Sequence, residues 1–369
     1  MNRILNFCKS HTVFCVAAVA AAVSCFFVPP DAAYLGYFDF KTLSCLFLTL
    51  AVVAALRNIK FFTILARKIV AVAGNLRTLA LALVYITFIG SMLIANDMAL
   101  ITFLPLGYFA LTTAKKETYM AYVFILQNIS ANLGGMLTPF GNPQNLYLYS
   151  YYSIPTGEFT QIMLPPFCLA VALLTVCCLL LRPEPLEIDG DFPEVLNLPR
   201  TALYLALFAF SILIVFRVVP FWIGLILIPA VLLFADRDAL AAVDYPLLFT
   251  FVMFFIFAGN ASRIEALRAL LSGLLEKSTL LVSTLSCQFI SNVPSAILLS
   301  RFTGNYRELL LGVNIGGTGT LIASLASLIT YSEFKLLCPT EGKKYLSLFA
   351  LLNLIFLAVL TAAAYFLMI

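Results

Sequence analysis

Residues 134–145 read Gly-Gly-Met-Leu-Thr-Pro-Phe-Gly-Asn-Pro-Gln-Asn, and they interrupt an apolar run that is otherwise long enough for a membrane-spanning helix. Pro139 and Pro143 have no amide hydrogen and clash with earlier carbonyl groups, so a regular helix cannot continue through them. Open backbone at membrane depth is tolerated only where protein or a water-filled cavity satisfies it. The segment therefore predicts a broken helix that lines a cavity, with an ordinary proline kink as the alternative.

The rest of the chain has the composition of a membrane protein. Of 369 residues, 62% are apolar and 11% are charged, and the mean hydropathy is +1.02. A helix needs about 20 apolar residues to cross the hydrocarbon core. The pattern predicts an all-α polytopic membrane protein without a soluble domain. Apolar runs predict about nine full spans, at residues 12–29, 41–56, 119–138, 159–181, 201–216, 219–234, 244–259, 306–326 and 345–369.

Two further apolar runs, 78–113 and 278–302, are each interrupted near the middle by polar residues. The interruptions read Ala95-Asn96-Asp97 and Ser291-Asn292-Val293-Pro294. One or two residues are too few to connect two full spans, so each run is predicted to form a re-entrant hairpin. A charge-bearing stretch precedes each hairpin, at 60–75 and 262–275, and is predicted to lie along the membrane interface.

The basic residues predict the orientation of the chain. Cytoplasmic loops carry an excess of Lys and Arg, and most of the 22 Lys and Arg residues fall in such loops if the N-terminus is cytoplasmic. We expect a multi-pass protein of the inner or plasma membrane, in contact with lipid. The net charge of +4 is spread between apolar runs and forms no basic face, which argues against a nucleic-acid partner.

The chain contains an internal repeat. Asn132-Leu133-Gly134-Gly135 and Asn314-Ile315-Gly316-Gly317 match in one frame, and this frame also pairs Thr138 with Thr320. With one unpaired span between them, two repeats enter the membrane from opposite sides, an arrangement typical of alternating-access transporters. The predicted units are a first repeat 1–182 (hairpin 78–113, broken helix 119–150), a cytoplasmic linker 183–200, and a second repeat 201–369, which begins with the unpaired span (hairpin 278–302, broken helix 306–330).

Two kinds of ligand suit these segments. Helix N-termini at the hairpin tips favour an anion, and opened backbone carbonyls favour a cation. We predict a sodium ion at Asn96, Gly141, Asn292 and Thr320. The candidate substrate- and ion-binding residues are Asn96, Asp97, Thr138, Gly141, Asn142, Pro143, Asn145, Ser291, Asn292, Pro294, Ser295, Asn314, Gly316, Thr318, Thr320 and Ser324.

Asp97 is the only acidic residue inside a predicted hairpin core. A charge at the membrane centre costs roughly 2.5 to 3.5 kcal/mol on insertion scales. Asp97 has three possible roles, which can coexist: it caps the second hairpin helix, coordinates a cation or carries a proton. The glycine pairs likewise have two possible roles, as close helix contacts or as ligand-facing positions.

These motifs resemble the ion transporter superfamily, which includes citrate and divalent-anion/sodium symporters, arsenite permeases and certain sodium/proton antiporters. The resemblance covers nearly the whole chain. Hairpin tips of the dicarboxylate branch look like Ser-Asn-Thr, whereas Asn96-Asp97 resembles the citrate-transporter-like and arsenite-permease branches. The resemblance implies transport of a small anion, with Na+ or H+ as the coupling ion, and a possible homodimer.

The sequence therefore predicts a secondary active transporter for a small anion, either citrate- or dicarboxylate-like or an inorganic oxyanion. The alternatives are sodium/proton antiport and arsenite-type oxyanion efflux. An intramembrane enzyme is disfavoured because the sole histidine, His11, lies near the N-terminus and no HExxH motif is present. The nine cysteines form no CxxC pair, and no organic cofactor is expected. A scaffold without transport leaves the matched broken segments unexplained.

Overall fold

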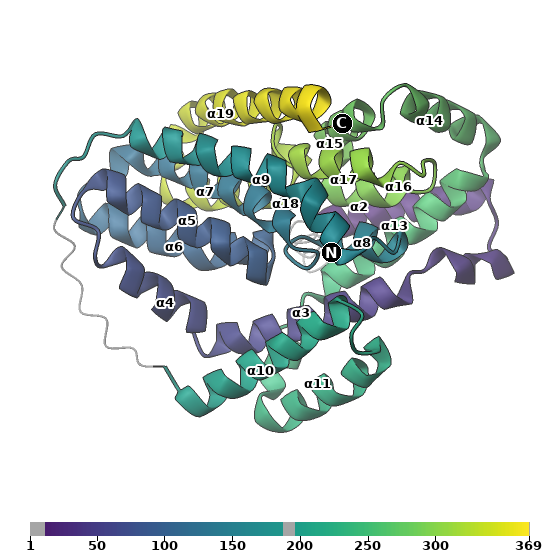
Figure 1. The fold of residues 1–369 in the computed structure, drawn as a ribbon, viewed down its shortest axis with the longest axis horizontal. Helices are drawn as coiled ribbons and strands as arrows, with labels where there is room; N and C mark the ends of the chain where they lie inside the picture. Colours follow the sequence, from purple (N-terminus) through teal and green to yellow (C-terminus); the bar gives the residue numbers. More distant parts are fainter. Residues whose placement is uncertain (1–11, 187–195, 369) are drawn as a thin grey trace.

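The computed structural model describes residues 12–186 and 196–368, and their regular elements are all helices apart from one β-bridge between Asn75 and Pro185 (Figure 1). His11 and the middle of the predicted linker lie outside the described residues. The first eight long helices are α2 Thr12–Phe27, α3 Phe40–Asn58, α4 Phe61–Val70, α5 Leu76–Ile94, α6 Asn96–Thr113, α7 Met120–Gly134, α8 Pro143–Tyr151 and α9 Thr156–Leu179. They are followed by α10 Leu198–Val215, α11 Phe221–Ala235, α12 Arg237–Ala241, α13 Tyr245–Arg263, α14 Glu265–Lys277, α15 Thr279–Ile290, α16 Asn292–Leu299, α17 Tyr306–Ile315, α18 Leu325–Leu337 and α19 Gly342–Ala363.

The helices form where the apolar pattern predicts them. Both interrupted runs are helix pairs joined at a single residue, α5–α6 at Ala95 and α15–α16 at Ser291. Six helical segments of the described chain are long and apolar enough to cross a membrane, and α2, α11 and α15 are shorter apolar helices. The full count of nine is not established by length, because α7 and α17 stop at their Gly-Gly pairs.

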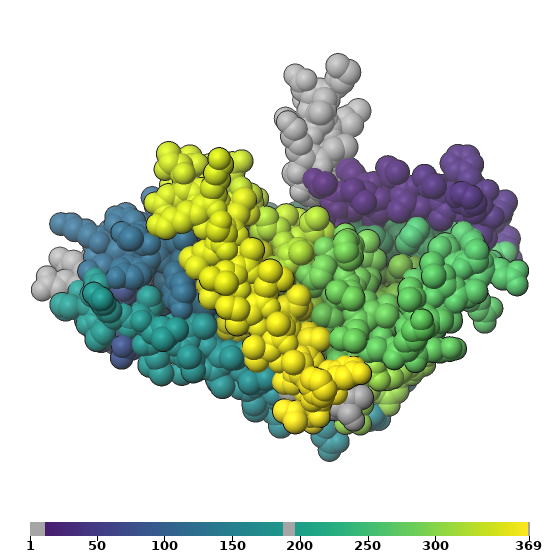
Figure 2. Space-filling view, turned by 90° about the horizontal axis from the view of Figure 1, so that it is seen from above, coloured from purple at the N-terminus to yellow at the C-terminus, as the bar shows by residue number. Residues whose placement is uncertain are grey.

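The helices pack in two groups. α2 lies along α13, while α10, α11 and α12 lie against α3. The second group contains both helix pairs and both broken helices, with α6 and α7 in contact with α18, and α8 in contact with α16 and α17. Figure 2 shows α19, in yellow, lying across the surface of this second group. There it contacts α7 and α9 from the first half and α15 and α17 from the second.

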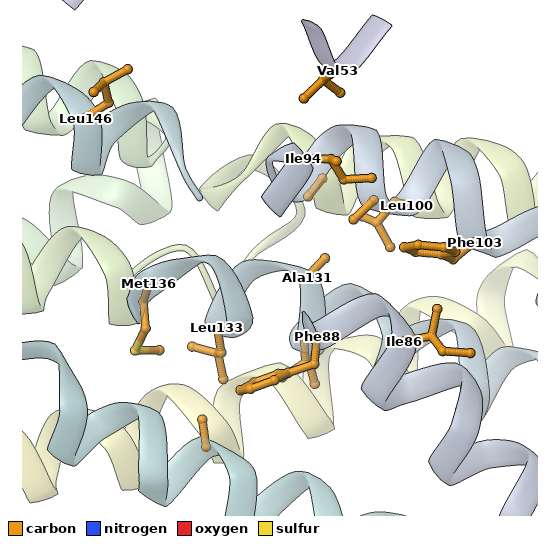
Figure 3. Close-up of a cluster of buried hydrophobic side chains, with 14 of the residues drawn as sticks. Val53, Ile86, Phe88, Ile94, Leu100, Phe103, Ala131, Leu133, Met136 and Leu146 are labelled. Atoms are coloured by element: carbon orange, nitrogen blue, oxygen red, sulfur yellow. The ribbon is translucent and has the colours of Figure 1, made fainter. Parts of the chain in front are cut away.

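The α5–α6 pair is held against α7 by interlocking side chains. Phe103 of α6 fits against Gly90 of α5 so closely that a Cβ atom at Gly90 would lie 2.3 Å from the ring. Because lipid tails are as apolar as these side chains, close van der Waals packing rather than escape from water stabilises such contacts. Figure 3 shows the cluster, with residues from α3, α5, α6, α7 and α8 labelled: Val53, Ile86, Phe88, Ile94, Leu100, Phe103, Ala131, Leu133, Met136 and Leu146.

Glu184 ties the start of the linker to the ends of the first helix pair. Its carboxylate accepts hydrogen bonds from Lys116 and from the Tyr119 hydroxyl, the latter at 2.8 Å. Its carbonyl oxygen accepts from the Leu76 amide at 2.9 Å. The ammonium of Lys116 and the hydroxyl of Tyr119 hold the pKa of the Glu184 carboxyl below its ordinary value of 4.5.

Replacing Glu184 by Gln is expected to lower the melting temperature at pH 7 and to have a smaller effect at a pH below 4.5. The depressed pKa means that the folded protein binds this proton more weakly than the unfolded chain. The interaction therefore stabilises the fold above pH 4.5 and is lost as the pH falls through the folded-state pKa. Thermal unfolding at both pH values measures this difference. Glu276→Gln, at an exposed position of α14, is the control, and equal effects of the two variants would contradict the prediction.

Candidate functional site

A cavity of about 40 Å³ lies where the first residues of four helices meet. The start of α6 contributes Asn96 and Asp97, the helices α8, α16 and α18 also begin at its wall, and α2 contributes Val13. α13 contributes Leu247, Thr250 and Phe254. Of the predicted site residues, six line this cavity: Asn96, Asp97, Pro143, Ser291, Asn292 and Pro294.

The two junctions have the same unusual backbone. Ala95 has φ 65° and ψ 153°, and Ser291 has φ 72° and ψ 161°. A residue with a side chain in this region carries about 1–3 kcal/mol of strain, which concentrates at functional sites. After each junction an asparagine side-chain oxygen accepts from the next amide: Asn96 from Asp97 at 3.0 Å, and Asn292 from Val293 at 2.9 Å. The tips of the two halves are therefore built alike.

Asp97 is the acidic residue of the cavity wall. Its Oδ1 atom is buried and has no hydrogen-bond partner. The N-cap position of α6 is Ala95, and the helix has no side-chain cap hydrogen bond. Asp97 therefore affects the helix terminus through its charge in the first turn and not through a capping bond.

The broken helix of the first half opens after Gly134, turns through a short 3-10 segment at Gly135–Leu137 and restarts at Pro143. Asn145 holds the opened turn: its amide nitrogen lies 3.2, 3.3 and 3.4 Å from the carbonyl oxygens of Gly135, Met136 and Thr138. These carbonyls, which the break leaves without helical partners, thus have a donor within the protein.

The remaining predicted residues of the first half, Thr138, Gly141 and Asn142, lie in the opened segment and do not line the cavity between the tips. The Thr138 hydroxyl donates to the Met92 carbonyl at 2.9 Å. Asn142 donates to the Asn132 carbonyl at 3.3 Å, and its Oδ1 atom is buried without a partner. That atom would lie 2.4 Å from a Cβ at Gly135, and a Cβ at Gly141 would meet the Gly135 carbonyl at the same distance. Both glycines are therefore required for the close approach of the two ends of the break.

In the second half, the side chain of Gln288 supports the opened backbone. Gln288 donates to the carbonyls of Gly316 at 2.9 Å and Thr318 at 3.1 Å, and its Oε1 atom accepts from the Thr320 amide at 2.9 Å. The Thr320 hydroxyl donates to the Gln288 carbonyl, and the Thr318 hydroxyl donates to Ile315. These threonines do not line the cavity between the tips. Gln288 is missing from the predicted residues, although a lone glutamine three positions before Ser291 in an apolar run signals such a role.

Ser295 and Asn314 also lie behind the cavity wall. The Ser295 hydroxyl pairs with that of Ser286 at 2.9 Å. Asn314 donates to the Asn145 side-chain oxygen at 2.6 Å, which joins the two broken helices.

Asn132 joins the halves more directly. Its Oδ1 atom accepts from the Asn96 amide at 3.1 Å and from the Ser324 hydroxyl at 2.7 Å. One turn earlier, Asn128 donates to the Ser327 hydroxyl at 3.3 Å and accepts from Thr330. Both asparagines are missing from the predicted site residues. Their spacing of four on one face of α7 is the sequence signal for this polar seam.

The first glycines of the two pairs are close helix contacts. A Cβ at Gly134 would lie 2.2 Å from the carbonyl oxygen of Phe88 in α5, and one at Gly316 would meet Cys287 of α15 at 2.9 Å. Gly317 differs, because its nearest neighbour is the amide nitrogen of Asn292 at 3.1 Å, at the second tip.

Gly134→Ala is expected to destabilise the fold by about 1–3 kcal/mol, because the added methyl group meets backbone that cannot rotate away. Gly273→Ala in α14 is the matched control, since nothing lies within 4 Å of its Cβ position, and alanine is the better helix former. Thermal unfolding of both variants in detergent measures the effect. Equal melting temperatures for Gly134→Ala and the parent chain would show that α5 and α7 separate at little cost.

Long apolar helices, two interrupted helix pairs and two broken helices around an internal cavity define the class of a multi-pass membrane transporter. Comparison with known proteins agrees. Residues 5–305 match the family model described as Citrate transporter. The chain belongs to the citrate transporter family.

Three relatives share this ancestry to different extents. An uncharacterised transporter of Methanocaldococcus jannaschii is 32% identical over 79% of this chain and 80% of its own length. The inner membrane protein YbiR of Escherichia coli is 31% identical over 73% of each chain. The silicon efflux transporter LSI3 of rice, Oryza sativa subsp. japonica, is 30% identical over 44% of this chain and 33% of its own length.

Proposed function

We propose that the chain is a secondary active transporter that carries a small anion by alternating access, coupled to Na+ or H+. The substrate is citrate- or dicarboxylate-like or an inorganic oxyanion. One observation carries this proposal: the N-termini of α6, α8, α16 and α18 lie at the wall of a single cavity.

Helix N-termini favour anions for two physical reasons. The first turn of each helix has amide hydrogens without intrahelical acceptors, and the aligned peptide dipoles place about half a positive charge at this end. Four such ends around one small space favour a negatively charged group without any Lys or Arg side chain in the wall. The asparagines at positions 96 and 292 add amide groups from both tips.

The order of the elements supports inverted repeats. Helix, short amphipathic helix, helix pair, broken helix and final helix follow one another from α3 to α9 and again from α13 to α19. If α2 and α11 are the first helices of the two units, α10 has no counterpart, and this one extra crossing reverses the orientation of the second unit. The distribution of basic residues supports an inner or plasma membrane location with a cytoplasmic N-terminus.

Efflux of an inorganic oxyanion is the second candidate. The partial match to a silicon efflux transporter favours it, as does a wall that holds one carboxylate and no cationic side chain. Such a wall suits a small, weakly charged solute better than a tricarboxylate.

Thermal stability of the purified chain tests both candidates, because a ligand that binds the native state raises its apparent stability. Citrate, succinate, sulfate, arsenite and silicic acid are each added in sodium chloride or in choline chloride. Stabilisation by one anion, lost in Asn292→Ala but kept in Asn353→Ala, supports anion transport through this cavity. Asn353 is buried in α19 and bonds only to the Phe349 carbonyl of its own helix.

Transport assays then separate import from efflux. Proteoliposomes loaded with the stabilising anion, or surrounded by it, report which gradient drives movement. A chain that responds to sodium or pH but to no anion would be a cation exchanger and would contradict the proposal.

A further inference from the structure

A second cavity, of about 30 Å³, lies on the other side of Asp97, between the first helix pair and helices α3 and α13. It shares Asp97 and Pro143 with the cavity between the tips. Its wall also contains Asp244, which begins the turn into α13, and the side chain of Thr49 from α3. Two carboxylates from distant parts of the chain therefore face one small space.

Neither carboxylate is neutralised by a basic side chain. Asp97 Oδ1 is buried without a partner, and one oxygen of Asp244 accepts from the Leu247 amide at 3.0 Å. The basic residue nearest along the wall is Arg57, which shares an adjoining cavity of about 10 Å³ with Asp244. Its guanidinium donates to the Met98 sulfur at 3.2 Å. Buried carboxylates normally have an ionic or metal partner, and the described residues supply none for Asp97 Oδ1, whereas Asp244 is only partly buried and has Arg57 beside it.

We propose that this cavity binds one alkali cation, Na+, between Asp97 and Asp244. The residues of its wall with oxygen atoms in their side chains are Asp97, Asp244 and Thr49. The Thr49 hydroxyl donates to the Cys45 carbonyl and keeps its lone pairs for a cation. The size of the cavity selects against a divalent ion. It has room for about two water-sized particles, whereas Mg2+ keeps several of its waters.

The site differs from the one that the sequence predicts at Asn96, Gly141, Asn292 and Thr320, because none of those residues lines this cavity. The inference adds a cation site to the proposed function. Sodium binding stands by itself, and only the coupling of sodium to anion transport rests on the proposed function. A sodium ion beside Asp97 neutralises the carboxylate that also faces the cavity between the tips. Sodium then removes the repulsion that Asp97 exerts on an anion there.

Asp39 provides a matched control. It begins α3 as Asp244 begins α13, and its carboxylate accepts from the Thr42 amide at 2.9 Å, but it does not line the cavity. Asparagine is as good an N-cap as aspartate. Asp244→Asn and Asp39→Asn therefore both keep their helix ends and each removes one negative charge.

The test is the melting temperature of the purified full chain in a titration of sodium chloride against choline chloride at constant ionic strength, without added anion substrate. The parent chain and Asp39→Asn are expected to show the same sodium-dependent rise. Asp244→Asn is expected to need about tenfold more sodium for half of this rise, and Asp97→Asn to show no rise at all.

Three results would overturn the site: no sodium effect in the parent chain, an Asp244→Asn curve equal to that of Asp39→Asn, or stabilisation by Mg2+ at lower concentration than by Na+. Failure of the proposed function looks different. Sodium stabilisation that depends on Asp244, in a chain that neither binds nor moves any anion, would leave the cation site standing and remove anion transport. Anion transport in a chain whose sodium response does not depend on Asp244 would keep the proposed function and remove the cation site.

Discussion

Asp97→Asn is expected to lower coupled anion transport by about tenfold or more while the protein still folds. Asparagine has nearly the same shape, and no hydrogen bond to Asp97 Oδ1 is lost. What disappears is the charge that faces both cavities. A tenfold change corresponds to about 1.4 kcal/mol, which is modest for the loss of a carboxylate that binds a cation in a poorly solvated site.

Initial rates in proteoliposomes, with and without a sodium or proton gradient, measure this effect, and the melting temperature monitors folding. Asp39→Asn again serves as the control for removal of a charge at a helix start. If Asp97→Asn transports the anion at the parent rate and still responds to the gradient, Asp97 has no part in coupling. If transport persists but no longer follows the gradient, the carboxylate couples ion and substrate without being needed for substrate binding.

The sequence predicts the local elements of this fold well because each has a local cause. Two glycines and two prolines within residues 134–143 together disfavour a continuous helix, and the structure opens the chain there. Prolines elsewhere, such as Pro105 in α6, lie inside helices. The tips at Ala95 and Ser291 follow from polar residues within apolar runs too short for two spans with a loop. Asn96 and Asn292 occupy matching places at the two predicted hairpin tips, and both line the same cavity.

The partners of the site residues are less predictable, because they depend on contacts between distant segments. Asn132 meets Ser324 across 192 positions of sequence, and Asp244 reaches the cavity of Asp97 only through the packing of α13 against α3 and α16. The repeat frame pairs Thr320 with Thr138, yet the Thr320 hydroxyl donates to the Gln288 carbonyl. A repeat frame aligns backbone positions, but it does not determine which polar side chains face the ligand.

Asn145 is a residue whose observed contacts differ from those that its place in the sequence suggests. As a polar residue after a broken helix it suggests a ligand contact, but its amide lies beside three carbonyl oxygens of the break and its Oδ1 accepts from Asn314. The opened carbonyls were expected to be free for a cation, and this asparagine supplies a donor to three of them. Its observed contacts are therefore those of a residue that supports the opened turn.

Asn145→Leu is therefore expected to destabilise the protein by about 2–4 kcal/mol. Leucine fills a similar volume but removes the side-chain donor from the carbonyls of Gly135 and Met136, and each buried group left unpaired costs about 1–3 kcal/mol. The side-chain amide of Asn314 loses one of its two acceptors and keeps the Leu310 carbonyl. Asn353→Leu is the matched control, because this buried asparagine bonds only to Phe349 of its own helix and its Oδ1 atom is already unpaired.

Unfolding in detergent compares the two variants without any ligand. We expect Asn145→Leu to melt well below the parent chain and Asn353→Leu to melt close to it or above it. Added substrate and sodium are expected to stabilise the Asn145 variant by the same increment as the parent, because the residue acts on the turn and not on the ligand. If the Asn145 variant melts at the parent temperature but is not stabilised by substrate and sodium, Asn145 is a binding residue, as its place in the sequence suggests.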